Sequence, residues 1–519
     1  MVQSNRLWRT ALVICLLLAL SVSDAALQPP RGRAARGLVQ VGAAAAASKS
    51  GTGAGGKKGA AVPTAHEHKM SLATLVVNIV ADLCPHGMLP LAYGISQGGP
   101  TGVVPALALL VFFGAMSAYT MTSFANMAAD TRTKSIGELW AKLVNPKTKW
   151  IADSAVFALC FGCCIFYSAF AGDIFGALSS ALGVTGIMGK RWVVLGLLST
   201  LCLLPLCLLE DLSALQFSSL LGVAGIAYTL VFHIVRALDG SYKPGAALLS
   251  GMGKKMQPSW PSVSTSSSSI SSGKFSLWRL NAGALVLVNM LCVAYLAHYN
   301  AINYYNELEH TSPARYQRAV YTGFGIAASV FAGMMIVGYS IFGSAAQPLI
   351  LNNFHRTADK LATGARLATG LAITFAYPLM FNGVKSSMFA MLPTKLDKGK
   401  GKDKDNAEGS QVSSETKQLR TAAVVAALAA ITGVAFKCGE EDVSIVLGIV
   451  GSVLGCGVAY VMPGYLGLVW QRARKAAGLK NSGFEVLANH ALVALGAVFG
   501  GLGVALTLQE AAHGGGHGH

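Results

Sequence analysis

Charged side chains are scarce in this chain. Only 12% of its 519 residues are Asp, Glu, Lys or Arg, whereas hydrophobic residues make up 53%. A soluble protein of this size would carry roughly twice that charged fraction. The shortage of charge therefore excludes an ordinary soluble domain and favours a chain that lies mostly within a lipid bilayer.

Sequence motifs of several enzyme and pump classes are also missing. The chain has no His-Glu-x-x-His sequence, so a membrane zinc protease is unsupported, and no G-x-x-x-x-G-K-[ST] loop, which argues against pumping driven by ATP. The ten cysteines lie almost entirely inside apolar segments, without the paired spacing of an extracellular disulfide framework. Buried small hydrophobic residues are the favoured interpretation, with a reactive Cys163–Cys164 pair as the weaker alternative. We expect no enzyme activity, no cofactor and no metal site.

What the chain has instead is about eleven long apolar stretches, each able to cross a bilayer as a helix of about 20 residues. They are too long and continuous for the short, alternating strands of a membrane β-barrel. The sequence therefore predicts an all-α integral membrane protein, with its transmembrane domain at residues 69–510. The predicted spans cover residues 71–97, 103–126, 151–182, 192–209, 217–237, 280–304, 318–343, 361–392, 421–437, 443–470 and 489–509.

The net charge of +17 comes mostly from cations in short connections between spans and in an N-terminal arm. This is the charge bias that sets membrane orientation, so we predict the lipid bilayer as a partner and no nucleic acid. Cation-rich connections at 127–150, 305–317, 393–420 and 471–488 place the mature N-terminus on the cytoplasmic side, or on the stromal side of a plastid.

The first 68 residues have the features of targeting sequences. Arg6 and Arg9 precede a short apolar run and a small-residue cleavage pattern, so residues 1–25 resemble a signal peptide. Residues 26–68 are basic in an Ala/Gly/Ser background and resemble a transit peptide. Together they resemble the bipartite presequence of algae with secondary plastids, which predicts the plastid envelope. The alternative is an uncleaved anchor with a disordered tail, in the plasma membrane or an endomembrane.

Three further segments have low complexity. The loops at 239–279 and 393–420 are predicted to be disordered, the first for its serine run and the second for its dense Lys/Asp charges. The Gly/His tail at 511–519 favours a solvated segment over a weak metal site.

The first predicted span of the mature chain contains residues that are expected to interrupt a helix. Asp82, Pro85, His86 and Pro90 all lie within a stretch of spanning hydrophobicity. An interrupted helix survives in hydrocarbon only inside protein or beside a wet cavity, and charged groups at that depth usually mark a transport path. The first span therefore predicts a carrier.

The sixth predicted span is unusually polar for a helix in contact with lipid. Its helical spacing would put Tyr295, His298 and Tyr299 on one side. Discontinuous first and sixth spans favour two five-helix repeats of inverted topology, with a binding site at the midplane where they meet. The polar residues of this span are Asn289, Tyr295, His298, Tyr299, Asn300, Asn303 and Tyr304.

Six ordered motifs carry a resemblance to a known family. Over roughly residues 71–510 the chain resembles the amino acid/auxin permease superfamily, most nearly its sodium-coupled neutral amino acid transporter branch. Where that family usually has a glycine-x-glycine break, this chain has Pro85-His86-Gly87, and the family's asparagine falls near Asn78 or Ala81, which leaves the cation open. The motifs are Gly87–Tyr93 with Gly98-Gly99, Tyr167 with Gly172-Asp173, Leu204–Leu209 with Asp211-Leu212 and Ser218-Ser219, His298 with Glu307-Leu308, Gly338-Tyr339 with Phe342-Gly343, and Arg366–Thr374 with Pro378 and Lys385.

The resemblance implies a LeuT-type 5+5 inverted repeat with broken helices 1 and 6. It also implies secondary active transport of amino acids, neutral ones by that branch, by alternating access coupled to Na⁺ or H⁺. We expect the protein to function as a monomer. Two rival functions stay open: an amino-acid sensor that binds without significant transport, and a carrier of another small organic acid such as an auxin-like compound.

The expected substrate site lies at the two breaks. Unwinding at Pro85–Gly87 would bare N–H groups at a half-helix N-terminus, where a substrate carboxylate is attracted. A packed core explains the tyrosines equally well, and His298 is as readily a hydrogen-bonded core histidine as a ligand. The substrate-binding candidates are Pro85, His86, Gly87, Tyr93, Tyr295, His298 and Tyr299.

The expected site for cation or proton coupling comprises Asn78, Asp82 and Thr374. By the resemblance, the Thr374 hydroxyl completes a cation shell of freed carbonyls. The alternative is a bond back to its own helix. Asp82 pairs with a cation or carries the coupled proton, which His86 would share. The alternative is that Asp82 caps the second half-helix.

Overall fold

The computed structural model describes residues 70–96, 101–209, 216–260, 278–280, 283–391, 414–438 and 448–514. Ten helices in these ranges are long and apolar enough to cross a membrane, and a shorter apolar helix, Leu72–Gly87, accompanies them. Within the described ranges, β-structure is limited to the isolated bridges Met70–Leu308 and Ser259–Gly343. The predicted all-α membrane fold is confirmed.

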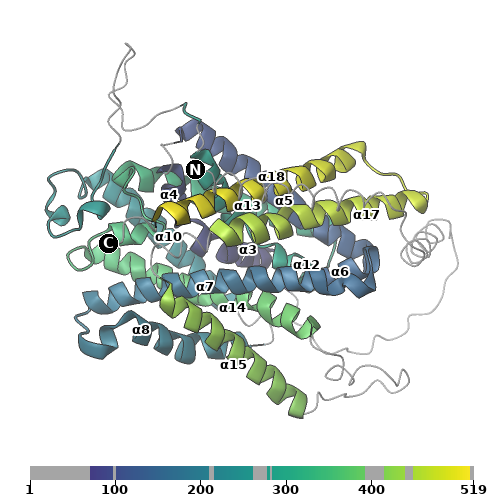
Figure 1. Ribbon diagram of the computed structural model, residues 1–519, viewed down its shortest axis with the longest axis horizontal. Helices are drawn as coiled ribbons and strands as arrows, with labels where there is room; N and C mark the ends of the chain where they lie inside the picture. The colour runs from purple at the N-terminus through teal and green to yellow at the C-terminus, as the bar shows by residue number, and fades with distance from the viewer. Residues whose placement is uncertain are drawn as a thin grey trace.

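The first five spans each have a direct counterpart in the sequence prediction. The first is divided into two helices, and the fourth is one helix whose middle turn is a wider π-helix. In chain order these elements are α3 (Leu72–Gly87) and α4 (Leu91–Ser96), α5 (Val103–Thr131), α7 (Lys149–Ala181), then α8 (Arg191–Leu198) with η3 (Ser199–Leu203) and α9 (Leu204–Leu208), and α10 (Gln216–Asp239) (Figure 1).

The next five spans again begin with a divided helix, and one further span follows them. The tenth span starts as two π-helical segments before it becomes α-helical. The elements are α11 (Ala284–Ala294) with η7 (His298–Asn300) and α12 (Ala301–Glu307), α13 (Pro313–Phe342), α14 (Lys360–Met391), α15 (Ser414–Lys437), then η11 (Val450–Gly455) with η12 (Gly457–Val461) and α17 (Met462–Ala476), and α18 (Gly483–Gly514).

Capping residues account for where two of these helices begin. The Ser71 hydroxyl accepts a hydrogen bond from the Thr74 N–H at 3.1 Å, so α3 starts at the following residue. Ser312 plays the same part for α13, accepting from Arg315 N–H at 3.3 Å. Pro313 suits the first position of that helix because its missing N–H would have no helical partner there.

The divided helices form the centre of the bundle. Every residue of α3 from Asn78 to Gly87 is buried, and the Ala284–Glu307 span is 94% buried over its most apolar window. Helix α3 packs against α10, α11, α13 and α14, while α7 and α14 lie side by side along the molecule (Figure 1). By contrast, only 28% of the most apolar window is buried in Arg191–Leu208 and in Ser219–Asp239, so these spans face outward.

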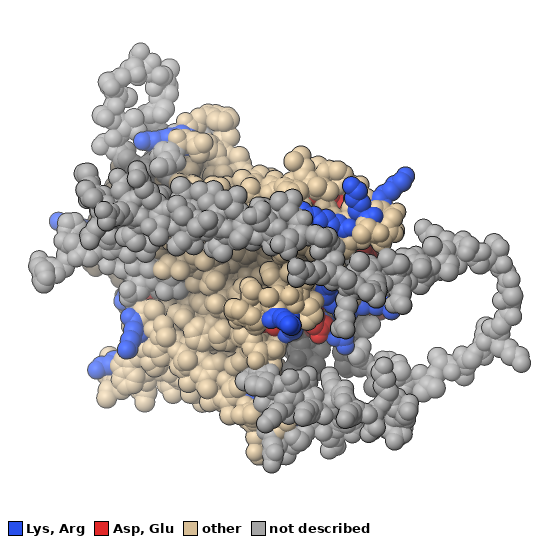
Figure 2. All heavy atoms as spheres, turned by 45° about the vertical axis from the view of Figure 1, so that its right-hand side comes forward, with Lys and Arg blue, Asp and Glu red and all other residues tan. Residues whose placement is uncertain are grey.

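The outer surface is suited to lipid. Large apolar side chains such as Val111, Leu201, Leu220 and Val498 are exposed on several helices. Figure 2 shows that Lys, Arg, Asp and Glu occupy only a small part of the visible described surface. Many exposed apolar side chains and few charged ones indicate a membrane environment.

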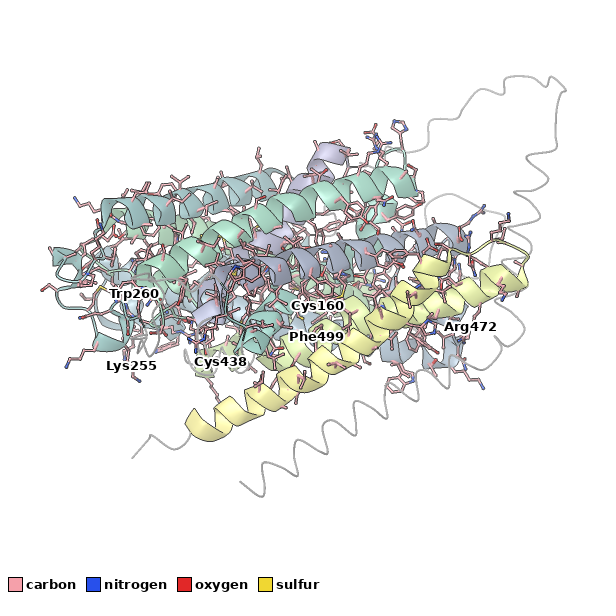
Figure 3. The ribbon with its side chains drawn as sticks, turned by 90° about the horizontal axis from the view of Figure 1, so that it is seen from above. Cys160, Lys255, Trp260, Cys438, Arg472 and Phe499 are labelled. Carbon is pink, nitrogen blue, oxygen red and sulfur yellow. The ribbon has the colours of Figure 1, made fainter. Side chains whose placement is uncertain are left out.

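The two ends of the bundle carry different connections. Figure 3 places Lys255 and Trp260 at one end of the molecule and Arg472 at the other. The second of these ends includes a short helix, α6 (Ile136–Leu143), and a 3-10 turn, η1 (Pro146–Thr148), within a connection that the sequence had left without structure.

The connection after α10 differs from the predicted disordered loop at 239–279. Residues 240–260 form turns and the 3-10 helices η5 (Ala247–Leu249) and η6 (Lys254–Met256). Backbone bonds attach this segment to the end of α13, with Ser259 N–H donating to Phe342 C=O at 3.1 Å and Ser344 N–H to Ser259 C=O at 2.7 Å. Docking on its neighbours gives the segment partners that a serine-rich sequence does not reveal.

The other predicted boundary segments lie mostly outside the described residues. These include the signal-peptide-like residues 1–25, the arm at 26–68, residues 261–277 and residues 392–413. Helix α15 begins at Ser414, inside the predicted loop at 393–420, and α18 extends to Gly514, into the predicted tail at 511–519.

Candidate functional site

The first span is interrupted, as predicted, but at a different place. Helix α3 continues through Pro85 and ends at Gly87, and the residues Met88–Pro90 belong to neither α3 nor α4. The prediction of an unwound segment at Pro85–Gly87 is therefore wrong. Pro85 removes one N–H donor, yet the Met88 N–H still bonds to Cys84 C=O at 3.1 Å. Pro90 ends the helix, because a residue that precedes proline disfavours the helical conformation.

Asp82 lies inside α3 rather than in the break. Its carboxylate is completely buried and faces the second half of the sixth span. It accepts hydrogen bonds from the hydroxyl of Tyr299, from the hydroxyl of Tyr304 at 3.0 Å and from the amide of Asn300 at 3.3 Å. The alternative that Asp82 caps the second half-helix is therefore wrong. Among the ion pairs of the described residues, none involves Asp82.

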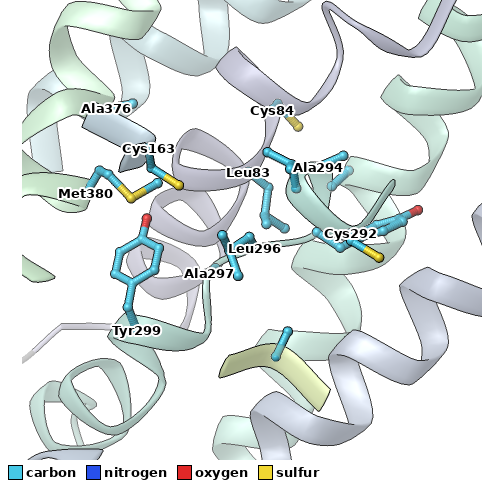
Figure 4. Close-up of a cluster of buried hydrophobic side chains, with 14 of the residues drawn as sticks. Leu83, Cys84, Cys163, Cys292, Ala294, Leu296, Ala297, Tyr299, Ala376 and Met380 are labelled. Carbon is cyan, nitrogen blue, oxygen red and sulfur yellow. The ribbon is translucent and has the colours of Figure 1, made fainter. Parts of the chain in front are cut away.

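The sixth span is broken too, which confirms the second predicted discontinuity. Helix α11 ends at Ala294, three non-helical residues follow, and η7 and α12 complete the span. Figure 4 shows this break beside Leu83 and Cys84 of α3, with the Tyr299 hydroxyl directed toward the side of Cys163. Because the helix is interrupted, Tyr295, His298 and Tyr299 do not share one helical face, and that part of the prediction is wrong.

His298 has one ring nitrogen partnered and one without a partner. Its Nε2 lies 2.8 Å from the Thr120 hydroxyl and 3.1 Å from the Ser117 carbonyl oxygen. The Thr120 hydroxyl donates its hydrogen to carbonyls of its own helix, so Nε2 is assigned as the protonated nitrogen of a neutral ring. Nδ1 then offers a buried lone pair that has no hydrogen-bond partner in the described part of the chain.

Three more buried polar atoms of the two broken spans have no partner among the described residues. They are the Tyr295 hydroxyl, Asn300 Oδ1 and Asn78 Oδ1. The amide nitrogens of both asparagines are occupied, since Asn78 donates to the Met70 sulfur at 3.1 Å and Asn300 to Asp82 and Leu379. Unsatisfied buried polar groups are rare in folded proteins. Together with His298 Nδ1, they make four buried polar atoms of the two broken spans without a partner in the described part of the chain.

His86 connects three helices and has both ring nitrogens occupied. Its Nδ1 accepts from the Tyr167 hydroxyl of α7 at 2.6 Å, and its Nε2 donates to the Val293 carbonyl oxygen of α11 at 3.1 Å. No side-chain bond joins His86 to Asp82 in the described structure. The Tyr167 hydroxyl lies 3.4 Å from the backbone oxygen of Asp82, not from its carboxylate. No hydrogen bond of the described residues joins the His86 ring to the Asp82 carboxylate, so proton sharing between them stays a prediction.

Thr374 makes the bond back to its own helix that was the alternative to cation binding. Its hydroxyl donates to Gly370 C=O at 2.7 Å. Pro378 lies one turn later in α14 and has no N–H to offer the Thr374 carbonyl, just as Pro85 offers none to the carbonyl of Ala81. Since α3 and α14 pack together, two carbonyls without helical donors occur on neighbouring helices.

The remaining predicted residues have packing roles that the structure makes visible. A Cβ atom added to Gly87 would lie 2.6 Å from Phe331 and 2.9 Å from the Ala294 carbonyl oxygen, so α3 approaches the sixth-span break closely there. Tyr93 is half-buried on α4. The structure joins Asp82 to Tyr299 directly, whereas no hydrogen bond of the described residues joins Asp82 to Asn78 or Thr374.

The sequence did not identify four residues that shape the site. Asn300 and Tyr304 were noted as polar, and their i, i+4 spacing was a usable signal of a shared partner. Tyr167 stood out only as part of a motif. Thr120 had no signal at all, because threonine is common in membrane helices.

Comparisons with known proteins add an independent line of evidence. The family model described as "Transmembrane amino acid transporter protein" matches residues 68–509. Among curated relatives, vacuolar amino acid transporter 5 of Schizosaccharomyces pombe is 21% identical over 62% of this chain and 70% of its own length. Amino acid transporter AVT6E of Arabidopsis thaliana is 22% identical over 56% of this chain and 58% of its own length. Sodium-coupled neutral amino acid transporter 7 of Mus musculus is 22% identical over 59% and 61%. The chain thus spans less than two thirds of the length of several of these relatives.

A solved structure of the same architecture was also found. MhsT in complex with L-phenylalanine matches with a TM-score of 0.50 and 14% sequence identity, over 86% of this chain and all of that one. At this identity the likeness shows the fold alone. It confirms the LeuT-type arrangement with broken first and sixth helices.

Proposed function

The chain belongs to the transmembrane amino acid transporter family, and from that membership we propose that it is a secondary active carrier of neutral amino acids. Transport is by alternating access and is driven by an ion gradient. One observation supports the coupling above all others: Asp82 is a completely buried carboxylate with only neutral hydrogen-bond partners, set between the two broken spans. A buried acid within a membrane span is costly, and such acids usually have a functional role.

The proton is the coupling ion that suits Asp82 best. Its partners include two phenol hydroxyls, which can donate to a carboxylate or accept from a carboxylic acid. Asp82 can therefore gain and lose a proton while the side chains around it stay in place. A sodium ion needs oxygen lone pairs, whereas the Asn300 amide presents hydrogens to the carboxylate.

Sodium coupling is the second candidate, and it uses other atoms. The carbonyls of Ala81 and Thr374 lack helical donors because of Pro85 and Pro378. The oxygen of the Thr374 hydroxyl keeps lone pairs after its hydrogen bonds to Gly370. With Asn78, these oxygens form the alternative cation site.

The substrate would be recognised at the breaks. His298 Nδ1 and Asn300 Oδ1 are acceptors that suit the ammonium group of an amino acid, and the carboxylate is proposed to bind at the first-span break. The hydrogen-bond partners of Asp82 and His298 are all neutral, so apart from Asp82 itself a charged substrate side chain finds no counter-charge among these groups. The proposed substrate-binding residues remain Pro85, His86, Gly87, Tyr93, Tyr295, His298 and Tyr299.

Uptake by the purified chain in proteoliposomes tests this function. We expect accumulation of a labelled neutral amino acid under an inward pH gradient and none when the gradient is collapsed by an ionophore. Binding without accumulation would favour the amino-acid sensor. Competition by an indole acid but by no amino acid would favour the organic-acid carrier. Accumulation that needs a sodium gradient alone would move the coupling site to Thr374.

The chain is an integral, multi-pass membrane protein, and its location among membranes is a separate proposal. Its relatives include proteins named as vacuolar transporters, which supports an endomembrane. The predicted signal peptide and plastid presequence depend on residues 1–69, which lie outside the described residues, and the comparisons give them no support. Fusion of residues 1–70 to a fluorescent protein tests them. Function as a monomer likewise stays a proposal.

A further inference from the structure

A close contact between α11 and the tenth span lies apart from the Asp82 cluster. The tenth span presents Gly451 and Gly455, one helical turn apart, to α11. A Cβ atom at Gly451 would lie 2.4 Å from the Val293 side chain and 3.1 Å from the Asn289 carbonyl oxygen, and one at Gly455 would lie 3.8 Å from the Cys292 carbonyl oxygen. Small residues at this spacing allow membrane helices to approach until their backbones nearly touch.

This approach brings two thiols together. The sulfurs of Cys292 on α11 and Cys456 on the tenth span are 3.5 Å apart, and both side chains are buried. A disulfide needs a sulfur–sulfur distance of about 2.05 Å, so the two atoms must close by about 1.5 Å. Side-chain rotation supplies movements of that size.

The positions of the two cysteines give the contact a mechanical consequence. Cys292 lies in the last turns of α11, just before the break at Tyr295 (Figure 4). Cys456 lies between the π-helical segments η11 and η12, and π-turns inside helices frequently occur at functional sites. A covalent bond between them would join the first half of a broken span to a different helix of the bundle.

We propose that Cys292 and Cys456 are an oxidisable dithiol whose disulfide locks the carrier in one conformation. The oxidant is a hydroperoxide. The simplest one, hydrogen peroxide, is small and neutral enough to enter an apolar region. One sulfur gives up its proton and attacks a peroxide oxygen as the thiolate; the O–O bond breaks, and the departing hydroxide takes that proton, which leaves a sulfenic acid and water. The sulfur of the second thiol then attacks the sulfenic sulfur, the S–O bond breaks, and the departing hydroxide takes the second proton to form a second water and the disulfide. Two thiols are oxidised and one peroxide is reduced to two waters. A dithiol reductant reverses the step by exchange.

The lock follows from how such carriers move. In alternating access one part of the bundle rocks against the other around the fixed site. A bond from α11 to the tenth span opposes any movement between these two elements, so transport stops while the fold is unchanged. Burial protects the pair from bulky or charged thiol reagents, which sets it apart from an exposed reactive cysteine.

Peptide mapping and uptake on the full-length protein test the proposal. The chain in proteoliposomes is treated with hydrogen peroxide, quenched with catalase, and digested for mass spectrometry. We expect a linked peptide that joins Cys292 to Cys456, loss of most amino-acid uptake, and recovery of both changes with dithiothreitol. The variants Cys292→Ser and Cys456→Ser should keep their uptake after peroxide. Cys207→Ser, a buried cysteine on α9, is the matched control and should stay sensitive.

Each other outcome counts against the proposal. Absence of the linked peptide overturns the dithiol, whatever uptake does. A linked peptide with unchanged uptake overturns the lock. Equal peroxide sensitivity of the double variant Cys292→Ala/Cys456→Ala and the unsubstituted chain assigns the effect to other residues. If the chain transports nothing before oxidation, the proposed function fails, while peptide mapping still decides whether the pair forms.

Discussion

Asp82 and Asp359 are two buried carboxylates with opposite surroundings. Each accepts a hydrogen bond from a tyrosine hydroxyl, Asp82 from Tyr304 at 3.0 Å and Asp359 from Tyr242 at 2.9 Å. Asp359 also forms a two-pronged ion pair with Arg236, with N–O distances of 2.5 and 2.9 Å. Asp82 has only neutral partners.

The paired carboxylate stabilises the structure. Asp359 joins the end of α10 to the start of α14 and also accepts from the Ala362 N–H at 3.0 Å, so it caps α14. Burial raises the pKa of Tyr242 above its usual range, so its phenol stays protonated and keeps donating to Asp359. With an arginine beside it, Asp359 has a structural role in holding α10 to α14. Asp82 has no charged partner, and this contrast is why we propose Asp82, and not Asp359, as the coupling acid.

Replacing Asp82 by Asn gives the largest expected effect on transport. The substitution keeps the size and the polar contacts but removes the group that takes up a proton. We expect concentrative uptake under a pH gradient to fall by at least about tenfold, which is about 1.4 kcal/mol in transport rate, while the melting temperature in detergent changes little. Asp153→Asn is the matched control, since Asp153 is paired with Lys149 at the start of α7. Full gradient-driven uptake by Asp82→Asn would remove Asp82 from coupling.

Asp359→Asn should lower the stability of the protein and leave the coupling of transport unchanged. Removing the buried partner of this ion pair leaves Arg236 with only the outer Asp239 as a counter-charge, and breaking a buried pair costs up to about 3–5 kcal/mol in stability. We expect a clear fall in the melting temperature in detergent, with normal ion preference in whatever protein remains folded. Asp239→Asn removes the outer, one-third exposed partner of Arg236 and should cost about 1 kcal/mol or less. Similar melting of both variants would contradict the structural role of Asp359.

The sequence located Asp82 but could not supply this contrast. Hydrophobic length identified the spans, and the prolines with the buried acid identified the first break, because both are local signals. The break is at Met88–Pro90 rather than Pro85–Gly87, since one missing N–H is tolerated at a helix end whereas the residue before Pro90 is not helical. The partners of Asp82 lie more than two hundred residues away, so only the folded chain shows that they are neutral. Arg236 and Asp359 are likewise 123 positions apart, and the sequence did not predict their ion pair.

Thr120→Val tests whether the unpartnered face of His298 binds substrate. The substitution removes one of the two oxygens that bind Nε2 and leaves only the Ser117 carbonyl, so the ring, and with it Nδ1, is held less firmly in its orientation. One such hydrogen bond is worth about 1.4 kcal/mol, which predicts a rise of about tenfold in KM with a smaller change in kcat. Thr122→Val on the same helix is the control, because its hydroxyl bonds only to Tyr119 C=O. An unchanged KM in Thr120→Val would leave His298 as a core residue.

Thr374→Ala has the smallest expected effect and decides between the two coupling ions. The hydroxyl bonds back to Gly370 within α14, and such bonds contribute little to helix stability. If Asp82 carries a proton, uptake under a pH gradient should change by less than about twofold, which is about 0.4 kcal/mol in transport rate. Uptake is compared under pH and sodium gradients, with Thr374→Ser as the variant that keeps the hydroxyl. A sodium response lost in Thr374→Ala but kept in Thr374→Ser would show that the oxygens freed around Pro378, and not the carboxylate of Asp82, hold the driving ion.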